Sequence, residues 1–123
     1  MPLAVITGAS RGLGRALARA LHDEGWSLVL DARDGDALQA AAPPGATVVA
    51  GDVTDPAHRA ALAAAVAEHG HLDLLVNNAS HLGPSPQPAL ADYPLEELRR
   101  VYEVDVLAPL ALLVAKGASW TYP

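Results

Sequence analysis

The residues best suited to hold a ligand lie close to the N-terminus, where three glycines follow one another at short spacing. The segment reads Thr7-Gly8-Ala9-Ser10-Arg11-Gly12-Leu13-Gly14, with an apolar run of strand length before it and apolar residues at helical spacing after it. Gly8 can adopt the positive φ of a tight turn, Gly12 would let backbone approach a pyrophosphate, and Gly14 would let the helix pack closely on a sheet. The N–H groups of the first helical turn would then face the phosphates, so this spacing predicts a phosphate-binding turn.

The spacing is Gly-x-x-x-Gly-x-Gly, whereas the commoner dinucleotide pattern is Gly-x-Gly-x-x-Gly. Preceded by a threonine, it resembles the glycine segment of the short-chain dehydrogenase/reductase family. The resemblance implies that the segment binds a nicotinamide dinucleotide through Thr7, Gly8, Ser10, Arg11, Gly12, Leu13 and Gly14. On spacing alone, an ordinary strand-to-helix turn that is rich in glycine is the alternative.

Strands and helices alternate along the chain, which predicts a parallel sheet with right-handed crossovers. We expect strands at 3–7, 27–32, 47–50 and 72–77, and helices at 12–24, 34–42, 56–69 and from Pro94 onward. The apolar face of the first helix would comprise Leu13, Ala16, Leu17, Ala20 and Leu21. The predicted fold class is α/β, a Rossmann-like doubly wound parallel sheet that is truncated and has strand order 3-2-1-4.

Composition narrows the range of partners. The 123 residues fit one domain, carry a net charge of −6 and include no cysteine, which excludes a disulfide framework and thiolate chemistry. The lack of a basic cluster argues against nucleic acid and anionic membranes. The longest apolar run, Val106 to Ala115, is too short to span a bilayer, and the N-terminus does not resemble a secretory signal. We therefore expect a cytoplasmic protein.

The five histidines do not form a metal-ligand pattern, so no metal site is expected. We interpret all of them as surface residues. They are His22, His58, His69, His71 and His81.

The end of the second strand is where a dinucleotide-binding fold contacts the adenosine ribose: an acid binds the 2′-hydroxyl, and an arginine accommodates a 2′-phosphate. By resemblance to the family, an acid that favours NAD would occupy the position of Ala32, and basic residues at Arg33 and Arg11 go with NADP. Two guanidinium groups match the geometry of a phosphate. We therefore favour NADP(H), and Asp31 keeps NAD(H) possible. The alternative is that both arginines are solvated surface residues.

Two further segments at strand ends resemble cofactor-binding segments of the family. Asp52 and Val53 follow the third strand, where the family places an Asp-Val pair against the adenine ring and the carboxylate accepts from the exocyclic amine. Asn77, Asn78 and Ala79 match the first three residues of its Asn-Asn-Ala-Gly segment after the fourth strand, and Ser80 departs from the usual glycine. Asparagines there can satisfy backbone groups of neighbouring strands and line the cofactor crevice. Taken alone, the Asp-Val pair could equally be part of a simple turn.

The last helix carries the most informative departure from the family pattern. Asp105 occupies the position of a family asparagine that belongs to the catalytic set, and an ionised aspartate accepts hydrogen bonds without donating them. Pro109 lies four residues later, so it should free the carbonyl of Asp105 and kink the helix. The alternative is a helix residue that faces solvent or pairs with Arg100.

The catalytic serine of the family and its Tyr-x-x-x-Lys pair have no counterpart in this chain. The resemblance covers a half-domain that binds NAD(P), residues 1–115, and residues 116–123 form a tail outside the family pattern. We interpret the chain as the cofactor-binding half of a short-chain NADP-dependent oxidoreductase that acts on an alcohol or carbonyl, inactive by itself and either truncated or frameshifted. The alternative is a non-catalytic nucleotide-binding or interaction module.

We expect the chain to form a homodimer. In the predicted sheet the fourth strand lies at an open edge, and unpaired strand edges invite pairing with another chain. The last helix also carries more apolar surface than one sheet face can cover, and the family uses this helix at a subunit interface. Residues 119–122 in the tail have the composition of a short strand and could lie beside the fourth strand.

The first prediction tests the glycine segment. Replacing Gly12 with valine should abolish dinucleotide binding while the fold stays largely intact, because a side chain there would occupy the space of the pyrophosphate. Calorimetric titration of NADPH into the wild type and Gly12→Val, with circular dichroism as the check on folding, measures this. Unchanged affinity in a folded variant would show that the segment is only a structural turn.

Overall fold

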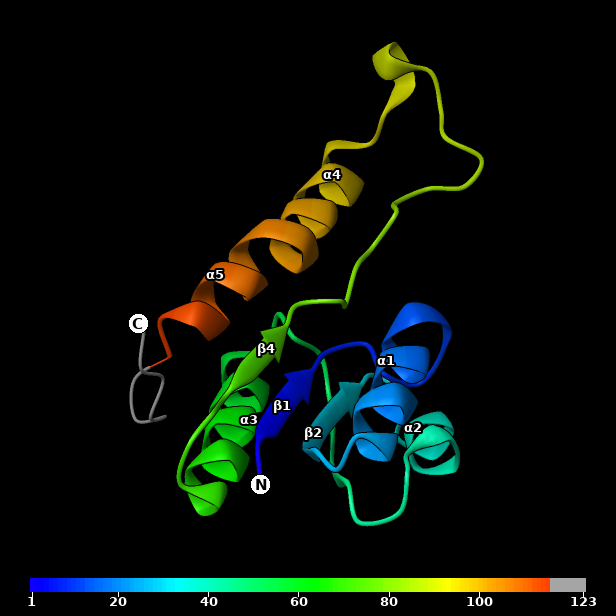
Figure 1. The fold of residues 1–123 in the computed structure, drawn as a ribbon. Helices are drawn as coiled ribbons and strands as arrows, with labels where there is room; N and C mark the ends of the chain where they lie inside the picture. The colour runs from blue at the N-terminus through cyan, green and yellow to red at the C-terminus, as the bar shows by residue number, and fades with distance from the viewer. Residues whose placement is uncertain (116–123) are drawn as a thin grey trace.

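The computed structural model describes residues 1–115, so the predicted tail and its possible strand at 119–122 lie outside the described residues. Four parallel strands form one sheet in the order β3-β2-β1-β4, and helices cover its faces (Figure 1). This confirms the predicted Rossmann-like fold class and strand order. The elements are β1 (Leu3–Ile6), α1 (Gly12–Asp23), β2 (Ser27–Ala32), α2 (Gly35–Ala41), β3 (Thr47–Ala50), α3 (Pro56–His69), β4 (Leu74–Val76), a 3₁₀ turn (Leu90–Asp92), α4 (Leu95–Tyr102), a π-helical turn (Glu103–Leu107) and α5 (Ala108–Leu113).

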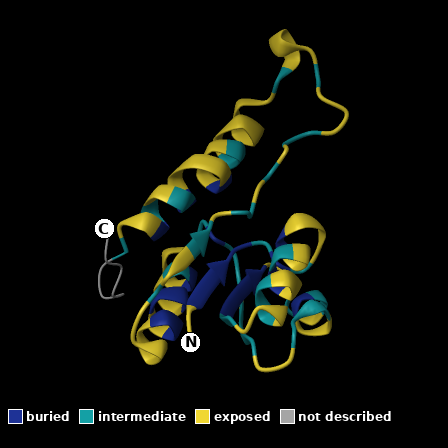
Figure 2. Cartoon of the chain, in the orientation of Figure 1, coloured by how far each residue is buried: buried dark blue, intermediate teal, exposed yellow. Residues whose placement is uncertain are grey.

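The core lies on both faces of the sheet, because side chains alternate along each strand. The face toward α1 and α2 buries a cluster that includes Ile6, Leu30 and Leu38. The opposite face buries a second cluster, in which Val29 of β2 packs with Leu62 of α3. Figure 2 shows β1 and β2 as buried throughout most of their length, as a parallel sheet covered on both faces requires.

The predicted inward face of α1 is correct at Leu17 and Leu21, which pack against the core, and wrong at three positions. The structure exposes Leu13, Ala16 and Ala20. The buried residues of α1 are instead Gly14 and Ala18. A Cβ atom on Gly14 would lie 2.4 Å from the carbonyl oxygen of Gly8, so only a residue without a side chain permits this approach. Small residues therefore decide which face of α1 meets the sheet.

Aspartate caps fix the starts of α2 and α3, which lie within a residue of the predicted starts. The carboxylate of Asp34 accepts hydrogen bonds from two backbone N–H groups of α2, and the carboxylate of Asp55 accepts one from α3. Gly70 ends α3 in the left-handed conformation, with φ of 90°. These contacts satisfy backbone groups that a helix end otherwise leaves unpaired.

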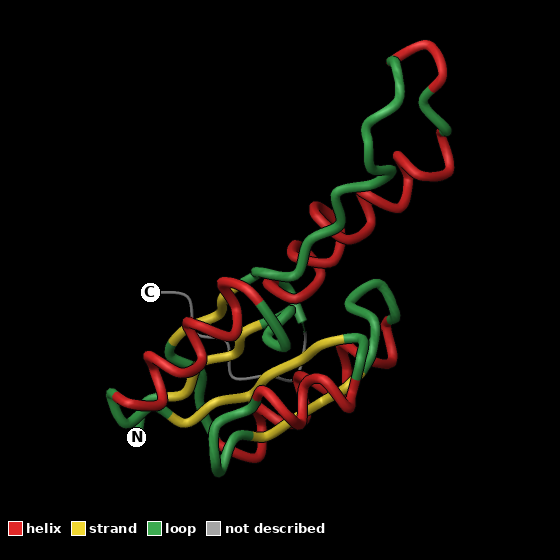
Figure 3. The backbone as a smooth tube through the Cα atoms, turned by 90° about the vertical axis from the view of Figure 1, so that its right-hand side faces the viewer, coloured by secondary structure: helices red, strands yellow, loops and turns green. Residues whose placement is uncertain are grey.

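The α4 helix, the π turn and α5 form one long helix that extends beyond the sheet (Figures 1 and 3). Pro109 lies in the first turn of α5 and has no N–H group to donate to the carbonyl of Asp105. The π turn accommodates this loss, and in both views α4 and α5 continue in one direction. The predicted kink is therefore a local widening of the helix.

The β4 strand forms an edge of the described sheet, and it is shorter than the predicted strand 72–77. Asp73 lies before it, and its carboxylate accepts a hydrogen bond of 2.8 Å from the backbone N–H of Leu3. Leu74, the first residue of the strand, is 37% exposed. Within residues 1–115, no helix combines the length and the apolar character that a membrane crossing requires.

Candidate functional site

A cleft of about 480 Å³ lies at the carboxyl ends of the strands. This is the edge where open α/β sheets bind their ligands. Five segments that are far apart in the sequence line the cleft: the glycine turn, the end of β2 with the start of α2, the loop after β3, the loop after β4, and the long helix through Arg100 and Val104. The predicted site residues that line it are Gly8, Ser10, Arg11, Gly12, Leu13, Arg33, Asp52, Val53, Asn78 and Ala79.

The glycine turn has the geometry that a phosphate cradle needs. Gly8 and Gly12 have φ of 66° and 59°, in the left-handed region that residues with side chains rarely adopt. A Cβ atom on Gly12 would meet nothing within 4 Å, so the space beside it is open to a ligand. Arg11 is the N-cap of α1, its side chain makes no capping bond, and no acidic residue occupies the first turn of α1. The N–H groups there can therefore face an anion.

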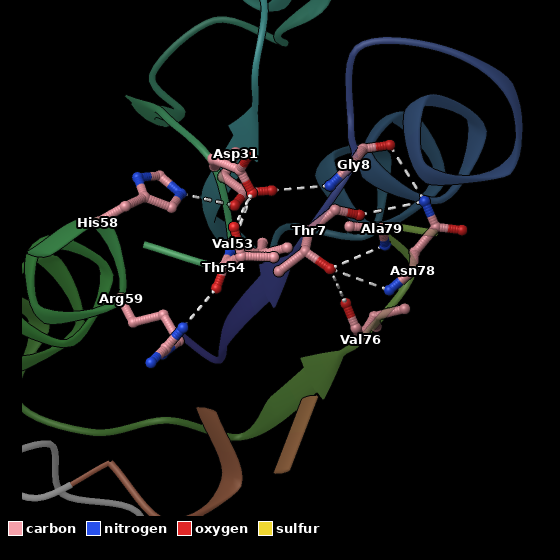
Figure 4. A network of polar contacts seen from close by, with 11 residues as sticks. Thr7, Gly8, Asp31, Val53, Thr54, His58, Arg59, Val76, Asn78 and Ala79 are labelled. Atoms are coloured by element: carbon pink, nitrogen blue, oxygen red, sulfur yellow. Dashed lines mark hydrogen bonds and ion pairs between the residues drawn. The ribbon is translucent and has the colours of Figure 1, made fainter. Parts of the chain in front are cut away.

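Thr7 and Asn78 fasten the glycine turn to the end of β4 (Figure 4). The hydroxyl of Thr7, which is buried, accepts hydrogen bonds from the N–H groups of Asn78 (3.0 Å) and Ala79 (2.9 Å). The amide of Asn78 donates back to the carbonyl oxygens of Thr7 and Gly8, both at 3.1 Å. The expectation that an asparagine would satisfy a neighbouring strand is thus met by Asn78, whereas Asn77 is exposed and does not line the cleft.

The residues at the end of β2 differ sharply in exposure. Arg33 lines the cleft from an exposed position, and Arg11 lines it from the glycine turn. Ala32 lies between Arg33 and Asp31 and is buried. Asp31 is 1% exposed, and its carboxylate accepts a hydrogen bond of 2.7 Å from the N–H of Gly8. The carboxylate of Asp31 therefore engages the protein's own backbone.

Asp52 is held by an ion pair that reaches across to the long helix. Its Oδ2 accepts a hydrogen bond of 2.6 Å from Arg100 of α4, and its Oδ1 accepts from the N–H and the hydroxyl of Thr54. Burial raises the pKa of Asp52, but the hydrogen bonds from Arg100 and Thr54 outweigh that effect and lower the pKa from 3.8 to about 2. Asp52 is thus an acceptor at any ordinary pH. Val53 beside it is buried against Val104 and Ala108.

Asp105 does not line the cleft, although the adjacent Val104 does. The Oδ1 atom of Asp105 accepts a hydrogen bond of 2.8 Å from the backbone N–H of His81, in the loop after β4. The alternative pairing of Asp105 with Arg100 is wrong, since Arg100 bonds to Asp52 and Thr54. The side-chain oxygen of an asparagine could accept a hydrogen bond from the same N–H, so either aspartate or asparagine can make this contact.

The expectation that all five histidines lie at the surface is wrong for His58. This residue of α3 is 6% exposed, and its Nε2 atom lies 2.8 Å from Oδ2 of Asp31 (Figure 4). The sequence did carry a signal for this pair. Asp31 ends the apolar run Leu28 to Leu30, and a carboxylate buried in such a strand needs a partner.

Sequence reasoning also missed the role of Arg100. The alternative partner that the sequence suggests for it is Asp105, which lies on the same helix. The true partners, Asp52 and Thr54, are 48 and 46 residues earlier in the chain. Only the crossing of α4 over the loop after β3 brings them together, and no local spacing encodes that crossing.

The chain belongs to the short-chain dehydrogenase family, since the family model described as short chain dehydrogenase matches residues 2–117. The chain is 42% identical over 109 residues to 1-deoxy-11-beta-hydroxypentalenate dehydrogenase of Streptomyces exfoliatus. This match covers 83% of this chain and 39% of that protein. It is 34% identical over 117 residues to galactitol 2-dehydrogenase of Agrobacterium fabrum, covering 92% of this chain and 44% of that protein. The chain thus spans less than half the length of these curated relatives.

Solved structures of the family superpose well on the described fold. A metagenomic short-chain oxidoreductase in complex with NADP has a TM-score of 0.80 at 39% identity, covering 91% of this chain and 53% of that one. A 3-ketoacyl-(acyl-carrier-protein) reductase from Brucella melitensis complexed with NADH has a TM-score of 0.80 at 33% identity. The match covers 90% of this chain and 46% of that one. These neighbours bind a nicotinamide dinucleotide, and they differ in whether it carries the 2′-phosphate.

The second prediction concerns the charge on Asp52. Its folded pKa lies below the value of 3.8, so ionised Asp52 stabilises the fold above about pH 4, and the gain is lost as the pH falls toward 2. We expect wild type to exceed Asp52→Asn in free energy of unfolding by about 1 kcal/mol near neutral pH, after allowance for solvent screening. Urea unfolding between pH 2 and 7 measures the difference.

Arg100→Met provides the matched comparison for this prediction, because it removes the cation and keeps most of the apolar stem. The difference in free energy of unfolding between wild type and Arg100→Met should therefore also shrink as the pH falls toward 2, although by less than for Asp52→Asn. A difference between wild type and Asp52→Asn that stays constant from pH 2 to 7 would contradict the assigned ion pair.

Proposed function

We propose that this chain is the cofactor-binding half of an NADP-dependent short-chain oxidoreductase that acts on an alcohol or a carbonyl. The observation that carries the choice of NADP is the end of β2. Arg33 and Arg11 both line the cleft from exposed positions, Ala32 stands where an acid would favour NAD, and the carboxylate of Asp31 accepts a hydrogen bond from the N–H of Gly8. Two guanidinium groups, those of Arg11 and Arg33, are therefore available to a 2′-phosphate on the ribose. The carboxylate of Asp31, at the end of β2, is already bonded to the protein.

The residues at the cleft fit a dinucleotide in chemical type along its whole adenosine side. The glycine turn and the first turn of α1 offer N–H groups to the diphosphate. Arg11 and Arg33 would hold the 2′-phosphate through charge-assisted bonds. Asp52, which stays ionised, would accept from the adenine amine, with Val53 beside the ring. When bound, the nicotinamide would supply hydride transfer.

A tyrosine with a nearby lysine would complete the chemistry in the family, and neither is available at the required spacing here. Tyr93 and Tyr102 lack a lysine four residues later. We therefore propose that the 123 residues on their own bind the cofactor without turnover, and that activity and substrate choice belong to the longer family architecture. Asp105 stands at the family asparagine position, and its catalytic role is part of this proposal.

A second candidate function is a non-catalytic nucleotide-binding or interaction module. An interaction role is favoured by the exposed apolar strip on the long helix, which comprises Tyr102, Val106 and Leu110. No other described segment of the chain covers these residues. The two candidates share the cofactor site and differ in whether family chemistry follows from it. A cytoplasmic location fits either one, because the chain is acidic and free of cysteine.

We also propose that the chain forms a homodimer through the long helix and the β4 edge. Tyr102, Val106 and Leu110 are each about half exposed on successive turns. In the described part of the chain, β4 pairs on one side only, with β1. A second copy related by a two-fold axis would cover both features at once.

The third prediction is that the chain binds NADPH at least about tenfold more tightly than NADH, because two guanidinium groups recognise the 2′-phosphate. Arg33→Ala should remove most of this preference and leave NADH affinity nearly unchanged. Calorimetric titration of both cofactors measures the ratio.

Arg19→Ala is the matched control for Arg33→Ala, since Arg19 is an exposed arginine on α1 that does not line the cleft. It should change neither affinity. A preference of the wild type for NADH would overturn the assignment and favour the alternative in which Asp31 binds the 2′-hydroxyl of the ribose.

The fourth prediction is that multi-angle light scattering gives a dimer mass for the purified chain, and that Leu110→Glu shifts it toward monomer. A charge buried against a second apolar strip without a partner is costly. Leu90→Glu is the control, because Leu90 is equally apolar and 92% exposed but lies on the 3₁₀ turn, outside the long helix. A monomer with and without residues 117–123 would refute the proposal.

A further inference from the structure

The pair formed by Asp31 and His58 is the most deeply buried polar contact of the site. Their side chains are 1% and 4% exposed, and Nε2 of His58 lies 2.8 Å from Oδ2 of Asp31. The second oxygen, Oδ1, accepts a hydrogen bond of 2.7 Å from the N–H of Gly8. Because a carboxylate accepts hydrogen bonds, His58 is the donor in the pair. One side chain thus joins β2, α3 and the glycine turn (Figure 4).

The chain makes specific room for this pair. A Cβ atom on Gly51 would lie 2.3 Å from Nδ1 of His58, so any larger residue at that position would displace the imidazole ring. The backbone reinforces the same junction, because the N–H of Ala9 donates to the carbonyl oxygen of Asp31 at 2.8 Å. The start of the glycine turn therefore meets Asp31 through both its backbone and its side chain.

Stability alone does not account for such a pair. Replacing both partners of a buried hydrogen bond with apolar residues of similar shape is often nearly neutral or favourable for folding, so the contribution that matters here is the geometry that the pair imposes. Here the geometry concerns Gly8, the first glycine of the turn. Its φ of 66° must be held against the other conformations that a glycine can adopt.

We propose that Asp31 and His58 are positioning residues that preset the glycine turn for the diphosphate of the dinucleotide. His58 orients the carboxylate of Asp31, and the carboxylate in turn holds the N–H of Gly8. This inference rests on the proposed cofactor binding. It assigns the pair to the part of the ligand that NADP and NAD share, so the pair affects both cofactors alike, in contrast to Arg33.

The test compares His58→Gln with His58→Asn. The amide nitrogen of glutamine can reach the position of Nε2, whereas that of asparagine is too short to reach Oδ2 of Asp31. We expect His58→Asn to weaken NADPH and NADH by the same factor, about tenfold for the loss of one bond to a charged group. His58→Gln should stay within about threefold of the wild type, since it keeps the donor. Calorimetry measures the affinities.

A second measurement is independent of any cofactor. Amide hydrogen exchange by NMR should show the Gly8 N–H protected in the wild type and in His58→Gln, and exchanging about tenfold faster in His58→Asn. A merely structural role would change global stability without singling out this amide. If the wild type binds neither cofactor, the proposed function fails while the exchange data still decide the role of the pair.

Two results would overturn the inference. One is a folded His58→Asn variant that binds both cofactors as the wild type does. The other is an unprotected Gly8 amide in the folded wild type, which decides the matter even where His58→Asn does not fold.

Discussion

Buried backbone polar groups at the carboxyl end of β1 impose the constraint on which the site depends. The strand is buried on both faces, so the backbone groups at its end have no access to water and need partners within the protein. Thr7 and Gly8 find them on two sides: Asn78 binds their carbonyls from the β4 side, and Asp31 binds the Gly8 N–H from the β2 side. The same bonds that satisfy the strand end therefore fix the turn at which a dinucleotide would bind.

Local signals explain the parts of the fold that the sequence predicted well. Apolar runs located all four strands, although the fourth is shorter than predicted, and the starts of α2 and α3 lie within a residue of the predicted ones. The face of α1 was predicted less well. Apolar spacing points Leu13 toward the sheet, whereas the close approach of α1 to Gly8 requires Gly14 there. Where backbone approaches backbone, the absence of a side chain outweighs hydrophobicity.

The candidate site shows the same division. Its glycines, Arg33 and Asp52 could be predicted because each follows a strand, and strand ends in a parallel sheet meet at one edge. His58 and Arg100 could not, because each lies on a helix and contacts a residue 27 or more positions away. A carboxylate at the end of an apolar strand signals that some partner exists. The fold alone decides which one.

The long helix is held to the rest of the molecule by a few buried residues, which include Ala108 and, in the second core cluster, Leu112 of α5. The described residues of α4 include none that is buried, and its Arg100 reaches the site through Asp52 and Thr54. One turn further on, Val104 packs on Val53, and Asp105 receives the N–H of His81. A ligand on Asp52 and Val53 would therefore contact the residues that hold this helix in place. If such a ligand changes how the helix is held, reciprocity requires that a partner bound to the exposed apolar side of the helix changes the affinity for that ligand by the same factor.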